Sequence, residues 1–89
     1  REPFLHWVRE VDYRACAHLD SIERFRVFAC LDGDGLDFFE VIEVSSLDAF
    51  RADMDTPIFQ SLVRSFNDLA QVKEQFGGEM IAPGYLRAT

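Results

Sequence analysis

The sequence predicts an α+β fold with an antiparallel sheet and two helices on one of its faces. Three observations predict it. A helical pattern opens the 89-residue chain, two strand patterns rich in aromatic and β-branched residues follow over 23–31 and 36–44, and a second helical pattern comes after them. This order is the β-α-β-β-α-β pattern of a ferredoxin-like sandwich without its first strand, which we expect to precede Arg1.

The chain opens with the pattern of an amphipathic helix, expected over about residues 3–18. Pro3 suits the first helical turn, because the N–H that proline lacks would have no intrahelical partner there. Residues 19–22, "LDSI", are expected to form a turn in which Asp20 and Ser21 bond locally to the backbone. The apolar residues at helical spacing are Phe4, Val8, Val11, Ala15 and Leu19, with Trp7 beside them.

The two strand patterns are joined by "DGDG", residues 32–35. One interpretation is a fragment of a calcium loop, but the remaining ligands and the closing glutamate of such a loop are missing from the sequence. The other is a hairpin turn, in which glycine supplies the positive φ that tight turns require. We favour the hairpin turn.

Two start signals predict the helices that follow the strands. Ser45 is the expected cap of the first, and Thr56 with Pro57 begins the second. Gly77 and Gly78 are expected to end that helix, and residues 79–82 form a candidate short final strand. The apolar stripe of the second helix consists of Phe59, Leu62, Val63, Phe66, Leu69 and Ala70.

The composition, net charge and cysteine spacing argue against several classes of function. The chain is expected to form one domain, residues 1–89, and its net charge of −7 opposes binding to nucleic acid or to an anionic membrane. No apolar run approaches the length of a membrane span. Cys16 and Cys30 have neither metal-site nor scaffold spacing, so we interpret both as reduced thiols in a cytoplasmic protein. We expect no metal site and no resident cofactor.

The second strand is apolar on both faces, so neither face resembles a fully solvated one. Two helices can cover only one side of such a sheet. The simplest cover for the other side is the same sheet from a second copy. The pattern therefore predicts a homodimer packed sheet to sheet.

The first helix carries four side chains that could take part in catalysis or ligand binding. On a helical wheel at about 100° per residue, His18 falls inside the apolar arc close to Trp7. Asp12 lies at the edge of the arc and Cys16 just beyond it. Tyr13 lies on the opposite side, where a surface position is expected.

Asp12 and His18 are the candidate catalytic residues, because an apolar wall shifts a pKa toward the neutral form, as in acid–base catalysts. Structural interpretations compete with this one. His18 could bond a carbonyl at the helix end, and Asp12 could pair with Arg9 or Arg24. Cys16 fits a small packing residue better than a nucleophile.

Glu40 is a further candidate, because Phe38 and Ile42 flank it on its strand face. A carboxylate in such a setting needs a partner, and Arg24 or Arg26 on the neighbouring strand could form a structural ion pair with it. The alternative is a catalytic or ligand-binding carboxylate.

The position of three aromatic rings would distinguish an enzyme from a structural or accessory protein. Trp7, Phe28 and Phe38 are candidates to line a substrate cleft. An open cleft exposing Asp12 and His18 would favour an enzyme, whereas a cleft filled by the three aromatic rings would favour a structural or accessory role. No phosphate loop, nucleophile elbow or dinucleotide motif is present in the sequence, so residue spacing alone supports no reaction class.

The segments "WVREVDYRACAHLDSIERFRVF" and "FFEVIEVSSLDAFRADMDTPIFQSLVRSFNDLA" resemble RedY-like (HapK-like) proteins of the dimeric α/β-barrel superfamily, from about residue 4 to residue 82. The most specific parts are "DYRACAHL" and "DAFRADM…PIFQ". The resemblance implies a ferredoxin-like protomer in a sheet-to-sheet dimer, with ligands between sheet and helices. The family's first strand, which often ends in a histidine-bearing segment, has no counterpart here. The residues implied to line the ligand cleft are Trp7, Asp12, Tyr13, Cys16 and His18.

Proteins of this family are encoded in biosynthetic clusters for prodiginines such as prodigiosin and for other pyrrole- or indole-derived natural products. The resemblance thus implies a small enzyme acting on an aromatic intermediate by acid–base chemistry such as cyclisation, condensation or cofactor-free oxidation. The alternative is a non-catalytic accessory or carrier protein for a hydrophobic intermediate. A third interpretation is a haem- or flavin-associated member of the superfamily.

Overall fold

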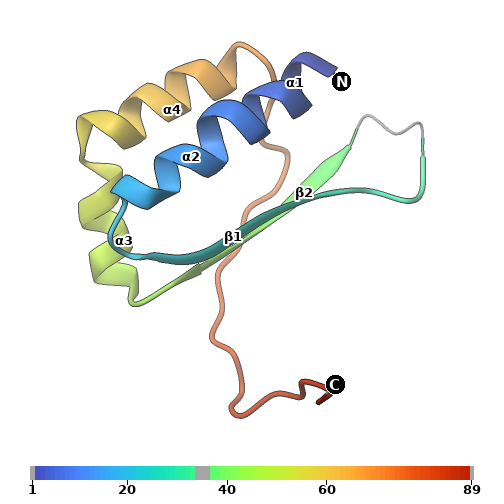
Figure 1. Cartoon of the computed structure of the whole chain (residues 1–89), viewed down its shortest axis with the longest axis vertical. Coiled ribbons are helices and arrows are strands. Elements are labelled where there is room, and N and C mark those ends of the chain that lie inside the picture. Colours follow the sequence, from blue (N-terminus) through green and yellow to red (C-terminus); the bar gives the residue numbers. More distant parts are fainter. Residues whose placement is uncertain (1, 34–36, 89) are drawn as a thin grey trace.

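The computed structural model describes residues 2–33 and 37–88 of the chain. A helical segment over residues 2–18 is followed by strands β1 (Ile22–Ala29) and β2 (Phe38–Val44), which form a two-stranded antiparallel sheet. Helices α3 (Leu47–Met54) and α4 (Pro57–Asn67) come next. Figure 1 shows the helices together on one side of the sheet, which confirms the predicted α+β arrangement.

The first helical segment spans the predicted residues, but its geometry changes along its length. It starts as α1 (Glu2–Trp7), passes through a π-helical turn (Val8–Asp12), continues as α2 (Tyr13–Ala15) and ends in a 3₁₀ turn (Cys16–His18). A π turn holds one residue more than an α turn, because each N–H bonds five residues back. Side chains after the π turn therefore face other directions than a regular wheel predicts.

The burial pattern follows this change of phase. Phe4, Trp7 and Val8 are buried, as expected for apolar residues at helical spacing, but Val11 of the same set is 41% exposed. Asp12 faces inward in its place and is half-buried.

The register of the sheet determines which side chains share a face. Val27 lies opposite Glu40, and Phe25 lies opposite Ile42. Opposite residues of an antiparallel pair point to the same side, so this face carries Glu40 toward the helices. The outer face carries Arg24, Arg26, Phe28, Phe39, Val41 and Glu43.

The connection between the strands agrees with the predicted hairpin as far as it is described. Cys30 N donates to Asp37 O at 3.1 Å, which continues the ladder past β1. Gly33 has φ of 90°, a left-handed conformation that favours glycine. Residues 34–36, including half of the predicted turn and the start of the predicted second strand, lie outside the described residues.

The predicted start of α4 is confirmed, but the cap of α3 is shifted by one residue. Thr56 Oγ1 accepts a hydrogen bond from Phe59 N at 3.3 Å, with Pro57 in the first turn. Ser46 rather than Ser45 caps α3. The Ser45 N–H donates to Ser21 O at 2.8 Å, so Ser45 still belongs to the strand pairing and the helix begins one residue later.

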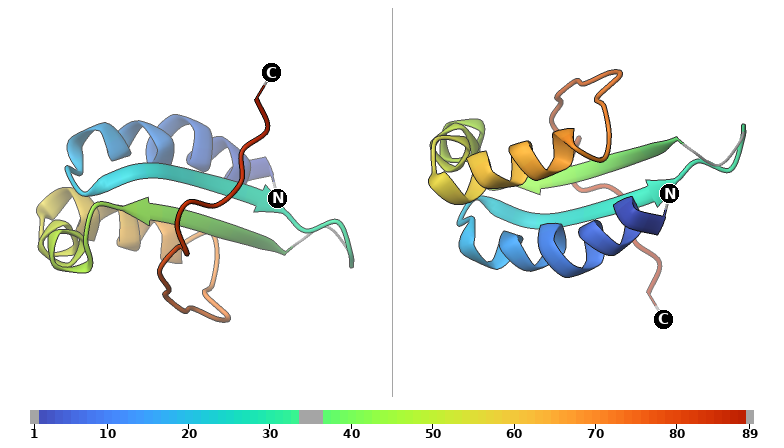
Figure 2. Two further views of the ribbon diagram at one scale, coloured as in Figure 1. Left: turned by 90° about the horizontal axis from the view of Figure 1, so that it is seen from below. Right: turned by 90° about the horizontal axis from the view of Figure 1, so that it is seen from above.

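The predicted end of α4 at Gly77 and Gly78 is wrong, because the helix ends at Asn67. The apolar stripe explains the difference, since the positions that would continue it carry the polar residues Lys73 and Glu74. Residues 70–88 have no regular secondary structure, so the candidate strand at 79–82 is also wrong for this chain as described. Figures 1 and 2 show this segment leaving α4 and passing beyond the sheet.

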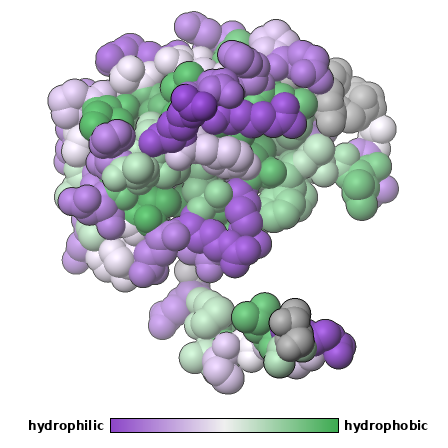
Figure 3. All heavy atoms as spheres, viewed as in Figure 1, coloured by the Kyte–Doolittle hydropathy of each residue, from purple (hydrophilic) through white to green (hydrophobic). Residues whose placement is uncertain are grey.

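The core is small for a sequence with 48% hydrophobic residues. Within the described part of the chain, the buried apolar residues are Phe4, Trp7, Val8 and Leu19. The Phe4 ring contacts the ring of Phe38, with centroids 4.9 Å apart. Much of the remaining apolar surface is open to solvent, on the body and on the C-terminal segment that projects from it (Figure 3).

A polar contact joins the turn before β1 to α3. Both the N–H and the hydroxyl of the buried Ser21 donate to Asp53 Oδ2, the N–H at 2.8 Å.

We expect Asp53→Ala to lower the free energy of unfolding by about 1–3 kcal/mol, because it leaves two buried donors without an acceptor. Urea unfolding measures this effect. Asp48→Ala is the matched control, since that carboxylate is almost fully exposed; an equal loss in both variants would contradict the assignment.

Candidate functional site

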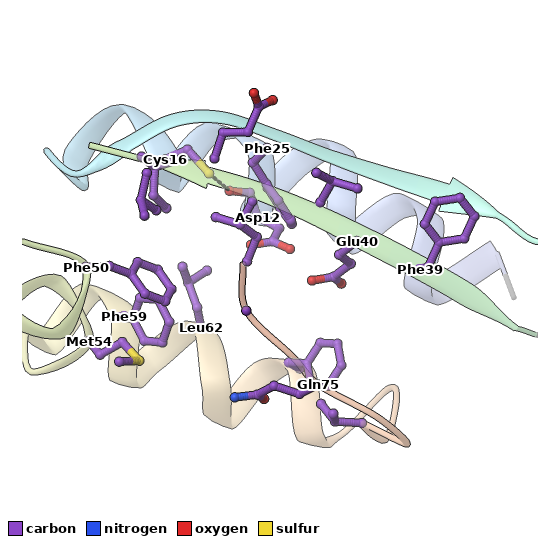
Figure 4. A pocket seen from close by; sticks show the side chains of 18 of the residues that line it. Asp12, Cys16, Phe25, Phe39, Glu40, Phe50, Met54, Phe59, Leu62 and Gln75 are labelled. Atoms are coloured by element: carbon purple, nitrogen blue, oxygen red, sulfur yellow. Dashed lines mark hydrogen bonds between the residues drawn. The ribbon is translucent and has the colours of Figure 1, made fainter. Parts of the chain in front are cut away.

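A long groove lies between the sheet and the helices, and Figure 4 shows it from close by. Its volume is 2650 Å³, whereas pockets for small ligands usually measure roughly 300–1000 Å³. The volume is this large because the groove is open: residues 69–80 also line it, and it reaches past the edge of β2 to Phe39, Val41 and Glu43 of the outer face. Its lining includes Asp12, Cys16, Phe25, Glu40, Phe59 and Leu62.

Two carboxyl groups meet in this groove from different elements. Asp12 comes from the π turn and Glu40 from the helix-facing side of β2, and both side chains reach into the same space (Figure 4). Burial raises the pKa of Asp12 to about 7, and the charge of Glu40 adds to the rise. Glu40 is partly open to solvent, yet the surrounding protein also raises its pKa.

Among the described residues, no arginine or lysine is seen to form an ion pair with Asp12 or Glu40. Arg24 and Arg26 approach Glu43 on the outer face, with N–O distances of 3.9 and 3.3 Å. The predicted ion pair of Glu40 with Arg24 or Arg26 is therefore wrong, and so is the predicted pairing of Asp12 with Arg24. The two carboxyl groups instead influence each other, so that near neutral pH they can hold one proton between them.

Cys16 lies one helical turn after Asp12 and also lines the groove. Its Sγ donates to the backbone oxygen of Asp12 at 3.4 Å. Burial, and then the charge of Asp12, raise the pKa of the Cys16 thiol. The thiol therefore stays protonated at neutral pH, which agrees with a packing residue and not with an activated nucleophile.

Tyr13 and His18 lie away from the groove. Tyr13 lies at the surface as expected and is 38% exposed. Its hydroxyl accepts a hydrogen bond from Val27 N at 3.0 Å, and its ring meets the edge of Phe25. Tyr13 thus covers the outer edge of β1. His18 is exposed and is not among the groove residues, so the prediction that it leans toward the sheet is wrong. The shifted phase after the π turn explains its position.

The aromatic candidates are divided between the two faces of the sheet. Trp7 and Phe38 line the groove as predicted, with Trp7 mostly buried against Phe66. Phe28 lies on the outer face, where its ring stacks on Phe39 with centroids 4.9 Å apart, so its placement in the cleft is wrong. The cleft is open and is not filled by these rings.

Several lining residues were not singled out from the sequence as site residues. They include Phe25 from β1, Met54 from α3, and Phe59 and Leu62 from α4. Strand alternation and the helical stripe place them on the inner side, but those patterns also describe an ordinary core. The available signal was the presence of a carboxylate, Glu40, on the same face as these apolar residues.

Comparison with known proteins relates this architecture to one family. The chain matches the family model described as REDY-like protein HapK over residues 1–81. The chain belongs to this family. The crystal structure of HapK from Hahella chejuensis resembles it with a TM-score of 0.87 and 38% sequence identity, covering 98% of this chain and 85% of that chain. No curated protein matches the sequence.

Other kinds of site are not evident in this HapK-family chain. Within residues 2–33 and 37–88, no three His, Cys, Asp or Glu side chains gather as a metal site would require. Over the same ranges, no helix has both the length and the apolar character needed to cross a membrane.

The raised pKa of Asp12 predicts how stability depends on pH. Between about pH 4 and pH 7, the folded chain holds a proton on Asp12 that the unfolded chain has lost, since the ordinary pKa is 3.8. The free energy of unfolding should therefore fall as pH rises through this window. Asp12→Asn removes this dependence and should be more stable than the wild type at pH 8.

Thermal unfolding at pH 5 and pH 8 tests this prediction. The wild type should lose more stability than Asp12→Asn on going to pH 8. Asp48→Asn, which changes an exposed carboxylate, serves as the control and should behave like the wild type. The same pH dependence in all three proteins would contradict the assignment.

Proposed function

We propose that this protein binds a flat aromatic intermediate of the pyrrole or indole type in the groove, and that it moves a proton with Asp12 and Glu40. One observation carries the proposal: two carboxyl groups without a described cation face each other in an aromatic-lined groove. The family membership supports a role in natural-product biosynthesis.

The chemistry of the pair suits general acid–base catalysis. A carboxyl group with a pKa of about 7 can donate a proton and accept it again near neutral pH. Asp12 would protonate a leaving hydroxyl or a carbonyl oxygen, while the Glu40 carboxylate accepts a proton from the ring N–H or an adjacent carbon. Cyclisation and condensation need only such transfers, whereas a cofactor-free oxidation would also need an electron acceptor such as dioxygen.

Aromatic side chains would hold the ring system. Phe25, Phe38 and Phe59 reach the groove from three different elements, so they can contact both faces of a planar ligand. The N–H groups of a pyrrole or an indole are hydrogen-bond donors, and the carboxylates are acceptors. Both parts of the ligand would thus find a matching surface.

Substitutions at the pair test the catalytic role. Asp12→Asn should lower product formation by roughly 10²-fold or more, as expected for a lost general acid–base catalyst. Glu40→Gln should move the pH midpoint of activity downward, because it removes the charge that helps to raise the pKa of Asp12. His18→Ala is the control, since that side chain lies outside the groove.

The assay adds each purified variant to lysate of a producing strain that lacks the protein, and mass spectrometry follows the intermediates consumed and formed. Circular dichroism confirms that each variant is folded. Unchanged turnover in both Asp12→Asn and Glu40→Gln would remove the pair from the mechanism.

The apolar lining of the groove favours a second candidate, a carrier or accessory protein for a hydrophobic intermediate. Such a protein would bind the intermediate tightly and release it unchanged after prolonged incubation. Trp7 is the one tryptophan of the chain and lines the groove, so its fluorescence reports binding in both cases. Chemical change of the bound intermediate separates the enzyme from the carrier.

We also propose that two copies pack through the outer faces of their sheets. This face has an apolar centre, formed by the stacked rings of Phe28 and Phe39, and a charged margin, formed by Arg26 and Glu43.

Phe39→Glu should weaken the dimer at least about tenfold, since it places a like charge on each copy. Sedimentation measures this effect, and Leu31→Glu on the hairpin is the control; equal effects would contradict the proposed face.

A further inference from the structure

We propose that Tyr13 blocks the outer edge of β1, the edge away from β2, and so keeps β1 of one copy from pairing with β1 of a second copy. The contact that carries the proposal is the hydrogen bond from Val27 N to the Tyr13 hydroxyl. A strand added beside β2 would leave the outer edge of β1 as it is. Asp12 and Glu40 take no part in the proposal, so it stands apart from the proposed function.

The register of the sheet shows which backbone groups face this edge. Cys30 N donates to Asp37 O at 3.1 Å, so every second residue of β1, counted back from Cys30, bonds to β2. Val27 belongs to the other set, and its N–H accordingly donates to the Tyr13 hydroxyl and not to β2. The residues of β1 whose N–H and C=O groups point away from β2 are therefore Phe25, Val27 and Ala29.

This edge has the features of a site for strand addition. β1 is eight residues long, and its residues 25–29, "FRVFA", contain one charged side chain, no proline and no glycine. Long apolar edge strands with unpaired N–H and C=O groups pair with other chains. Among the described residues, no partner outside the sheet is seen for the amides of Phe25 and Ala29. The Tyr13 hydroxyl thus covers the central donor of an edge that is otherwise open on both sides of it.

The charges of β1 favour one way of pairing with a second copy. A twofold axis through Phe25 would place Arg24 of one copy opposite Arg26 of the other, and an axis through Arg26 would place two Arg26 side chains opposite each other. An axis through Val27 places Arg26 opposite Phe28 instead, and arginine already lies over this ring within one copy, 5.5 Å from its centroid. In this register, each Val27 N–H would donate to the Val27 carbonyl oxygen of the other copy.

Tyr13 opposes this register directly. It is the first residue after the π turn, and its helical segment runs alongside β1 (Figures 1 and 2). Its ring packs edge-on against Phe25 with centroids 5.6 Å apart, which holds the hydroxyl at 3.0 Å from Val27 N. An incoming strand would have to displace this hydroxyl in both copies before the two Val27 residues could pair.

Removal of the hydroxyl alone tests the inference. Tyr13→Phe keeps a ring that can pack on Phe25, but Val27 N loses its acceptor. We expect self-association to become at least about tenfold tighter, because two hydrogen bonds no longer have to break when two copies pair. Sedimentation velocity over a range of concentrations measures this effect.

The matched control removes the same group from the other tyrosine of the chain. Tyr85 is 80% exposed on the C-terminal segment, so Tyr85→Phe should associate like the parent protein. All of these proteins carry Phe39→Glu, which weakens the proposed dimer through the outer faces. Ala29→Lys added to Tyr13→Phe should restore the behaviour of the parent, because a lysine on an edge strand opposes pairing.

Hydrogen exchange shows whether the new contact uses this edge. In the dilute parent protein, the Val27 amide should exchange at least about tenfold more slowly than the amides of Phe25 and Ala29, after correction for intrinsic rates. In dilute Tyr13→Phe this difference should disappear. As the concentration of Tyr13→Phe rises, all three amides should become protected together, while the Phe28 amide, which already faces β2, stays unchanged.

Three outcomes would overturn the inference. Equal association of Tyr13→Phe and Tyr85→Phe would show that the hydroxyl does not block pairing. A loss of stability in Tyr13→Phe without association, or association that Ala29→Lys does not reverse, would show that Tyr13 only ties α2 to β1. Association that leaves the amides of Phe25 and Ala29 in free exchange would place the contact elsewhere on the protein.

Discussion

The π-helical turn at Val8–Asp12 is the constraint on which the site depends. In a regular α-helix, the inward positions after Val8 would be Val11 and Ala15, and the sheet would pack on an apolar helix. The extra residue of the π turn directs Asp12 inward and Cys16 with it. Such turns are rare within α-helices and occur often at functional sites. Here the irregular turn is what brings a carboxyl group into an apolar groove.

The second carboxyl group, Glu40, changes the acid–base properties of the inward-facing Asp12. Glu40 sits on the sheet face that the helices cover, while the arginines of β1 project from the opposite face and pair with Glu43. The strand alternation therefore separates the cations from the inner carboxylate. Burial and the proximity of Glu40 act in the same direction on the pKa of Asp12. The feature that lowers stability at high pH is thus the same one that would make the pair useful for proton transfer.

The sequence predicts the strand faces and the start of α4 well, but the candidate site only in part. Strand alternation assigned Glu40 and Phe38 to one face correctly, and Thr56 with Pro57 marked the start of α4, because these signals are local. The wheel placed His18 inward because it assumes a constant rotation per residue, and no local signal reveals a π turn. The absence of an ion pair at Glu40 depends on the register between two strands, which neither strand encodes alone.

Packing through the outer face would cover Phe28 and Phe39, whereas Asp12 and Glu40 lie on the helix side of the sheet. A sheet-to-sheet dimer on its own would therefore leave Asp12 in contact with bulk water. Acid–base pairs act most strongly where water is excluded and the local dielectric is low. A closed site also needs cover on the helix side of the sheet, where residues 69–80 already line part of the groove. The small core and the open site thus have one physical cause, a groove that the described residues do not fill.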